Sequence, residues 1–206
     1  MITAKQLTIF EVFGQKPFTE FTRKEVKSLA KEKSNNALAR ALNTWIKEGI
    51  LLEKKVGKSG LLTLNLNNPI SFYYLALSNH NKLSKPVQIS LETIKQELQN
   101  CTPFYSIVIF GSYAEGKQKQ SSDLDVAIFI ENDEKKKRIE AALNSAKLKT
   151  PLEIDGHIIT FSEMLQMLTE KQENLGKQII RKHLVVHNHY LFYDIIKEGM
   201  NRGFRV

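Results

Sequence analysis

Two apolar runs separated by a polar, glycine-containing segment constrain the fold of this chain more than any other feature. Residues 104–110 (FYSIVIF) and 124–130 (LDVAIFI) are short, continuous and rich in β-branched and aromatic residues, which is typical of buried strands. The segment between them places Gly111-Ser112 directly after the first run and Asp123 and Asp125 at the start of the second. The chain is therefore expected to hold a glycine turn beside a pair of carboxylates.

The surrounding sequence predicts a mixed α/β domain over residues 86–206. Helical stripes precede and follow the two runs, and residues 152–160 form a third predicted strand. Three further helical stretches are expected after it, broken near Gly176 and at the HLVVHNH segment. The stripes consist of Val87, Leu91, Ile94 and Leu98, and of Ile139, Ala142, Leu143 and Ala146. Strands that alternate with helices indicate a small mixed sheet, with helices expected on one of its faces.

The first third of the chain predicts three helices. The first covers residues 3–14, and Thr22 with Glu25 has the spacing of a capping box at the start of the second. Ser34 or Asn35 can cap the third, and Gly49 follows where that helix should end. One buried stripe of the third helix is formed by Leu38, Ala41, Leu42, Trp45 and Ile46, and its outward face by Asn36, Arg40, Asn43 and Lys47.

A predicted hairpin follows these helices. Two β-prone runs flank a Gly-Lys-Ser-Gly turn within ILLEKKVGKSGLLTLNLNN. Three helices followed by a hairpin resemble the winged helix-turn-helix family over residues 1–68, on order, spacing and charge. The resemblance implies that the third helix enters the DNA major groove and that the hairpin lies along the backbone. Residues 69–85 are expected to form a connecting helix and a polar linker.

The charge distribution supports a polyanionic partner for that first domain. The net charge is +8, and residues 1–68 contain 12 Lys and Arg against 6 Asp and Glu, whereas residues 69–206 contain 18 against 16. Such a segment favours polyanions, and the winged-helix resemblance implies that the polyanion is double-stranded DNA. A basic surface that serves only solubility and a protein-docking winged helix stay open as alternatives. The candidate nucleic-acid contacts are Arg40, Asn43, Lys47, Lys54, Lys55 and Lys58.

The segment from Phe110 to Val126 carries the chemistry. Glycine at 111 lets the backbone approach a ligand closely, and the Ser112 hydroxyl can donate to a phosphate oxygen. Asp123 and Asp125 are two residues apart on a predicted strand and so share a face. Two carboxylates held together repel each other unless a cation lies between them, and Mg²⁺ or Mn²⁺ bridging to nucleotide phosphates is the expected solution.

This segment closely resembles the polymerase-beta-like nucleotidyltransferase superfamily, whose pattern is Gly-Ser-x-Ala-Arg-Gly followed after five residues by Ser-Asp-x-Asp. The matching residues are Gly111, Ser112, Ala114, Gly116, Ser122, Asp123 and Asp125. The chain departs from the pattern at Glu115, where arginine is common. The resemblance implies that Gly111, Ser112 and Ser122 contact the nucleotide, with ATP the expected NTP, and that both aspartates bind metal.

The resemblance also implies a third carboxylate on a later strand, which helps to activate the acceptor hydroxyl. Asp155 is the preferred candidate, with Glu153, two residues earlier, as the alternative. Small members of the superfamily often work beside a separate helical partner protein, so such a partner is a further expectation.

Other features exclude some classes of protein. The single cysteine, Cys101, cannot form an intramolecular disulfide, and no stretch approaches the roughly 18 apolar residues of a membrane span. The start of the chain lacks the apolar core of a signal peptide, so a cytoplasmic protein without membrane contact is expected. His183, His187 and His189 do not have the spacing of a zinc site.

The sequence therefore predicts a metal-dependent nucleotidyltransferase that transfers a nucleoside monophosphate from an NTP to an acceptor that the sequence does not identify. The alternative is a winged-helix DNA-binding regulator whose second domain binds nucleotide without turnover.

Overall fold

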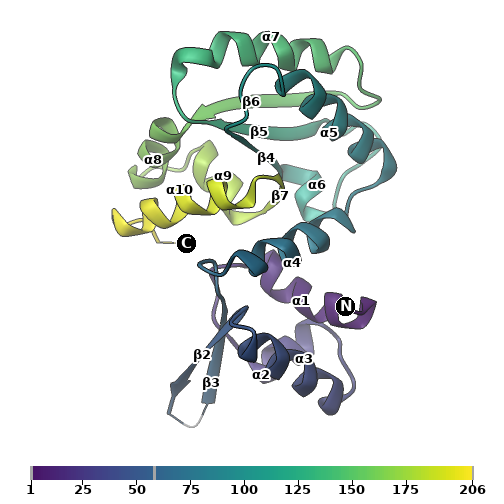
Figure 1. Ribbon diagram of the computed structural model, residues 1–206, viewed down its shortest axis with the longest axis vertical. Coiled ribbons are helices and arrows are strands. Elements are labelled where there is room, and N and C mark those ends of the chain that lie inside the picture. Colours follow the sequence, from purple (N-terminus) through teal and green to yellow (C-terminus); the bar gives the residue numbers. More distant parts are fainter. Residues whose placement is uncertain (1, 58, 206) are drawn as a thin grey trace. The chain divides into compact units, whose positions relative to one another are not determined.

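The computed structural model describes residues 2–57 and 59–205, which form two compact units, Met1–Asn81 and Lys82–Val206 (Figure 1). The helix α4 (Pro69–His80) belongs to the first unit. The first unit therefore includes residues that the sequence assigned to a connecting segment. None of the helices in the described part of the chain combines the length and the apolar character that a membrane span needs.

The first unit begins with three helices, each capped at its start by a serine or threonine side chain. These helices are α1 (Ala4–Gln15), α2 (Arg23–Leu29) and α3 (Asn35–Lys47). The predicted capping box is present at α2, where the Thr22 hydroxyl accepts from the Glu25 amide and the Glu25 carboxylate accepts from the Thr22 amide. Ser34, rather than Asn35, caps α3. Such caps satisfy amides that have no partner within the helix.

A small antiparallel sheet completes this unit, with strand order β1-β3-β2 and with β1 lying between α1 and α2 in the sequence. Its strands are β1 (Phe21–Thr22), β2 (Leu51–Val56) and β3 (Ser59–Leu64). The predicted turn was too long, because Ser59 and Gly60 already pair with Val56 and Lys55. Lys58 lies outside the described residues.

The core of the first unit is aromatic. The Trp45 ring packs edge-on against Phe10 and Tyr74, with ring centroids 5.6 and 6.1 Å apart. Trp45 is only 1% exposed, which confirms its prediction as a core residue. The buried indole of Trp45 therefore packs α3 against both α1 and α4.

The second unit is built on a four-stranded sheet with strand order β6-β5-β4-β7. Its strands are β4 (Tyr105–Phe110), β5 (Leu124–Ile130), β6 (Ile154–Thr160) and β7 (His183–His187). β5 and β6 are parallel, whereas β4 is antiparallel to both β5 and β7. The sequence missed β7 and treated it as a break between helices, because its two histidines resemble loop residues.

Helices cover both faces of this sheet, so the prediction of helices on one face was wrong (Figure 1). On one face, α5 (Lys85–Leu98) and α7 (Lys136–Lys147) share a core with alternate residues of β4 and β5, such as Ile107 and Ile128. On the other face, the Phe129 ring packs 5.2 Å from that of Phe192 in α10 (His189–Asn201). Both faces of these strands carry apolar side chains, so both faces of the sheet need helices to cover them.

The helices α8 (Phe161–Thr169) and α9 (Leu175–Arg181) are separated at residues 170–174, close to the break that was predicted near Gly176. Gly176 lies inside α9, and a Cβ there would approach the Met167 Cβ to 2.8 Å. The glycine therefore permits close packing between two helices instead of ending one.

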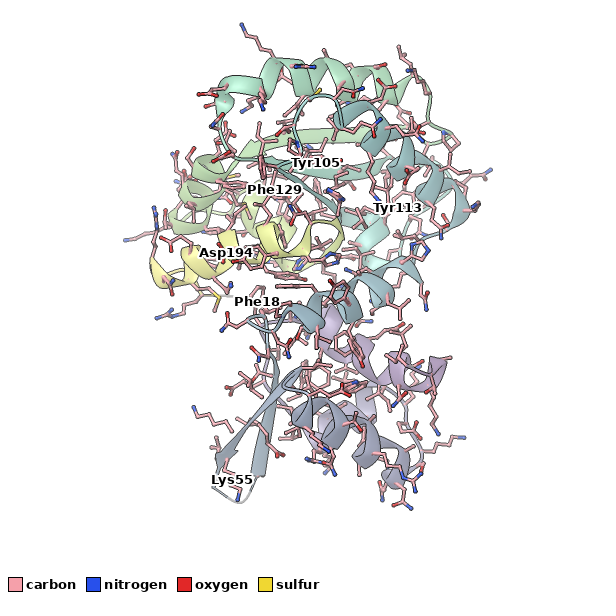
Figure 2. The ribbon with its side chains drawn as sticks, in the orientation of Figure 1. Phe18, Lys55, Tyr105, Tyr113, Phe129 and Asp194 are labelled. Carbon is pink, nitrogen blue, oxygen red and sulfur yellow. The ribbon has the colours of Figure 1, made fainter. Side chains whose placement is uncertain are left out.

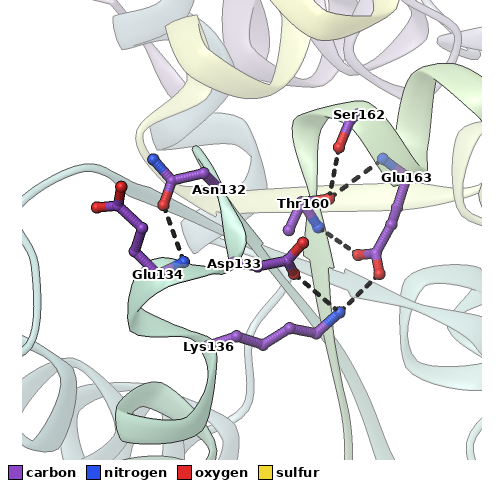
Figure 3. A network of polar contacts seen from close by, with 7 residues as sticks. All are labelled: Asn132, Asp133, Glu134, Lys136, Thr160, Ser162 and Glu163. Atoms are coloured by element: carbon purple, nitrogen blue, oxygen red, sulfur yellow. Dashed lines mark hydrogen bonds and ion pairs between the residues drawn. The ribbon is translucent and has the colours of Figure 1, made fainter.

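A polar network fixes α7 and α8 at the carboxyl ends of β5 and β6 (Figure 3). Lys136 contacts Glu163 at 2.6 Å and Asp133, in the short 3₁₀ helix η1 (Asp133–Lys135), at 3.7 Å. Glu163 also accepts from the Thr160 amide at 2.7 Å as part of the α8 capping box. Lys136 is thus a bridging residue between α7, η1 and α8.

Candidate active site

The turn after β4 brings the backbone close to a carboxylate. Gly111 begins the short helix α6 (Gly111–Glu115) with a φ of +63°, and Gly116 ends it with a φ of +68°. A Cβ on Gly111 would lie 2.1 Å from the Asp125 Oδ2 atom. Only glycine fits there, since the conformation is left-handed and the space is filled by the carboxylate.

Strand register brings two of the three predicted carboxylates together. Asp125 in β5 pairs directly with Asp155 in the parallel strand β6, and directly paired residues of parallel strands share a face. Asp123 lies just before β5 and is exposed. The sequence therefore placed Asp123 one position too far into the strand.

The electrostatics of Asp125 reflect this crowding. Its pKa is raised above the ordinary value, first by burial and then by the Asp155 carboxylate, with a smaller contribution from Asp123. His157 acts in the opposite direction on the same pKa. A group with this environment is disfavoured as an anion unless a positive charge is added.

His157 is a site residue that the sequence analysis missed. Its Nε2 lies 3.3 Å from the Asp155 Oδ2, and its ring centroid lies 5.7 Å from that of Phe110. It follows Asp155 by two positions in β6, so both side chains leave the same face of the strand. That spacing was the available signal for it.

Register also separates the two candidates for the third carboxylate. Asp155 is the residue opposite Asp125, whereas Glu153 precedes β6 and its carbonyl accepts from the Leu124 amide at 2.8 Å. Glu153 is two positions before Asp155 and precedes the first pair of the ladder, Leu124 with Ile154. The geometry therefore favours Asp155 as the neighbour of Asp125.

The carboxylates of Asp123, Asp125 and Asp155 are suitable ligands for a hard divalent cation, since carboxylate oxygens are the ligands that Mg²⁺ prefers. The glycine turn that leaves room for the Asp125 carboxylate and the raised pKa of that group agree with such a site. Among residues 2–57 and 59–205, however, no three His, Cys, Asp or Glu side chains are gathered tightly enough to hold a metal as they stand. The Asp155 carboxylate is oriented toward His157.

The loop between α6 and β5 is held by Ser122 and Tyr113. The Ser122 hydroxyl accepts from the Lys119 amide at 2.9 Å, and the Ser122 carbonyl accepts from the Tyr113 hydroxyl at 3.4 Å; Tyr113 is labelled in Figure 2. Ser122 thus stabilises the loop that leads into Asp123. Its predicted nucleotide contact stays a prediction, as does that of Ser112, which is half-buried in α6.

The predicted nucleic-acid residues of the first unit are exposed where the structure describes them. Arg40, Asn43 and Lys47 lie on the outward face of α3, and the Asn43 amide oxygen accepts from Arg23 at 3.0 Å. Lys54 and Lys55 are consecutive in β2, so they point to opposite faces of the hairpin. Their contact with DNA phosphates stays a prediction; Lys55 is labelled in Figure 2.

The fold and this arrangement of a glycine turn beside paired aspartates define a nucleotidyltransferase domain. The family model for polymerase beta, nucleotidyltransferase, matches residues 92–199, more than half of the chain. The chain therefore belongs to this nucleotidyltransferase family.

Among solved structures, the chain is similar to one described as the crystal structure of the toxin-antitoxin with AMP-PNP. The two are 18% identical with a TM-score of 0.36, and the match covers 54% of this chain and 84% of that one. No curated protein matches this chain significantly.

Proposed function

We propose that the second unit transfers a nucleoside monophosphate from an NTP to an acceptor hydroxyl and releases pyrophosphate. One observation supports this above the others: Asp125 lies against the Gly111 turn and directly opposite Asp155. In such a transfer the α-phosphorus forms a bond to the acceptor oxygen, and its bond to the β-phosphate oxygen breaks. The acceptor proton must pass to a base.

The proposed roles follow from position. Gly111 and Ser112 contact the triphosphate, because the glycine allows close approach and the first amides of α6 have no partner within the helix. Asp123, Asp125 and Asp155 hold one or two divalent cations, Mg²⁺ or Mn²⁺. When bound, the metal neutralises charge that develops on the phosphates. Asp155 takes up the proton of the acceptor hydroxyl, and His157 is placed to orient the Asp155 carboxylate.

Turnover with labelled nucleotides tests this proposal. The protein is incubated with Mg²⁺ or Mn²⁺ and each labelled NTP, with ATP expected to be preferred, and pyrophosphate and labelled products are followed. The same assay with Asp123→Asn/Asp125→Asn should give no product. The Glu153→Gln variant is the matched control and should retain turnover, because Glu153 does not lie opposite Asp125.

The competing proposal is that this unit senses nucleotide without turnover. Calorimetry of Mn²⁺ binding in the presence of ATP separates the two when it is combined with the assay above. Metal binding that depends on Asp123 and Asp125 without pyrophosphate release supports the sensor. Metal affinity that does not change in the double variant contradicts the metal site itself.

We also propose that the first unit is a winged helix that binds double-stranded DNA. The order α1, α2, α3 and hairpin, the exposed polar face of α3 and the basic hairpin support this. Phosphate contacts release counterions, so the affinity should fall with salt with a log–log slope of about −0.9 for each neutralised phosphate. Replacing Lys54, Lys55 and Lys58 with glutamine should weaken binding to all sequences and flatten that slope.

Changing Arg40 should instead alter sequence preference, provided that its side chain reaches base edges. Anisotropy with random and selected duplexes decides between DNA and a protein partner. Absence of binding below about 100 μM at low salt, weaker than ordinary non-specific binding, would leave the domain as a protein-docking surface. The helical partner protein and the cytoplasmic location stay expectations from the sequence.

A further inference from the structure

Three charged side chains gather beside the Gly111–Glu115 helix. Lys117 lies directly after Gly116 at the end of α6, and its Nζ lies 2.8 Å from the Glu115 Oε2. Lys182 comes from a distant part of the sequence, between α9 and β7. Because Phe110 pairs with His183 in the antiparallel ladder, Lys182 flanks Gly111 at its next position.

The charges of these side chains interact. The pKa of Glu115 is lowered, first by its hydrogen bond to Lys117 and then by the charges of Lys117 and Lys182. Lys182 is exposed, and no carboxylate in the described part of the chain forms an ion pair with it. The neighbouring Arg181, in contrast, is paired with Glu173 at 2.5 Å.

The cluster therefore carries an excess of positive charge beside the turn that is proposed to bind phosphate. The cluster holds two lysines and one glutamate, and only Lys117 forms an ion pair with Glu115 in the described part of the chain. That pair is exposed, with 33% of the Glu115 side chain and 72% of the Lys117 side chain accessible. An exposed ion pair contributes little to stability. Glu115 can thus be exchanged for a more strongly charged anion at small cost.

We propose that Lys117 and Lys182 form a cationic pair that contacts the β- and γ-phosphates of the nucleotide, and that Glu115 is their counter-ion when the nucleotide is absent. This inference rests on the proposed nucleotide site at Gly111 and Ser112. Lysine ammonium groups bind phosphate as point charges and need no fixed bidentate geometry. The pair would distinguish a triphosphate from a monophosphate, because only the former reaches beyond the α-phosphate.

Equilibrium binding of ATP and of AMP in the presence of Mg²⁺ tests the proposal. Lys182→Gln should weaken ATP binding by about tenfold, the size of one charge-assisted hydrogen bond, and leave AMP binding unchanged. Glu115→Gln should tighten ATP binding, since both lysines lose their competitor. Lys171→Gln, an exposed lysine at the start of the 170–174 segment, is the matched control and should change neither.

The outcomes separate this inference from the proposed function. If wild type binds ATP and Ser112→Ala weakens that binding, but Lys182→Gln binds ATP as wild type does, the cationic pair is wrong and the nucleotide site stands. Equal losses for ATP and AMP in Lys182→Gln would also overturn the pair. If wild type binds no nucleotide at all, the proposed function and this inference fail together.

Discussion

Asp125 of β5 and Asp155 of β6 are paired residues of a parallel ladder, and the Asp125 carboxylate fills the space that a side chain at position 111 would need. The glycine turn and the acidic pair are thus one packing unit. Changes at either part are expected to affect the other.

Replacement of Gly111 by alanine tests this coupling. The backbone there has a φ of +63°, and such a conformation costs a residue with a Cβ about 1–3 kcal/mol. The added methyl also collides with Asp125, so Gly111→Ala should lose more stability than this and should displace the carboxylate. Gly116→Ala is the matched control, because it has a φ of +68° with open space around it. Equal losses in denaturant unfolding of the two variants would contradict the coupling.

Neutralising Asp125 should stabilise the metal-free protein at neutral pH. Its pKa is raised in the folded state, so the stability that it contributes is present at low pH and is lost as the pH rises through the folded pKa. Asp125→Asn removes this loss, and its advantage over wild type should vanish in acid. The exposed Glu140 on α7 serves as the control, as Glu140→Gln should show no such pattern. Added Mn²⁺ should stabilise wild type and not Asp125→Asn; the reverse result would speak against a metal at this carboxylate.

Stability in weak acid should depend on His183. This side chain is buried, its Nδ1 donates to the Ile180 carbonyl at 3.0 Å and its Nε2 accepts from the Tyr193 hydroxyl at 3.2 Å. Burial lowers its pKa to about 4. The unfolded chain therefore binds a proton first, and stability falls as the pH decreases from about 6.5 toward about 4, by at most about 3 kcal/mol.

The His183→Gln variant should be less stable than wild type at pH 7 but should lose less stability over that interval. His80→Gln, at an exposed position near the end of α4, is the control and should follow the wild-type curve. The measurement is the free energy of unfolding by denaturant at several pH values. An unchanged slope in His183→Gln would show that other groups cause the acid loss.

Removal of the Ser112 hydroxyl should weaken NTP binding by about 1–2 kcal/mol, the scale of a hydrogen bond to a charged group. Ser112→Ala should keep the stability of wild type, because the side chain is only half-buried. Ser162→Ala, in α8 at the opposite end of β6, is the control for nucleotide affinity. An NTP affinity equal to that of wild type in a stable Ser112→Ala protein would place the triphosphate elsewhere.

Local patterns predicted much of the chain because they depend on neighbours in sequence. The capping box at Thr22, the buried stripe around Trp45 and the run LDVAIFI were confirmed as a helix start, a core face and the strand β5. In each case the determining interactions lie within a few residues, so composition and spacing contain them. The spacing from Gly111 to Asp125 likewise identified the nucleotidyltransferase family.

Only the tertiary structure decided which distant residues meet. The parallel pairing of β5 with β6 places Asp155, which the sequence could only prefer over Glu153, directly opposite Asp125, and it brings His157 into the site. The antiparallel pairing of β4 with β7 places Lys182 beside Gly111. The sequence analysis missed β7 because its two histidines resemble loop residues. Strand order and register depend on how whole faces of a sheet pack against helices, and a shift of one residue exchanges those faces. Local sequence fixes the character of each segment, whereas these partners are set by the packing of the complete unit.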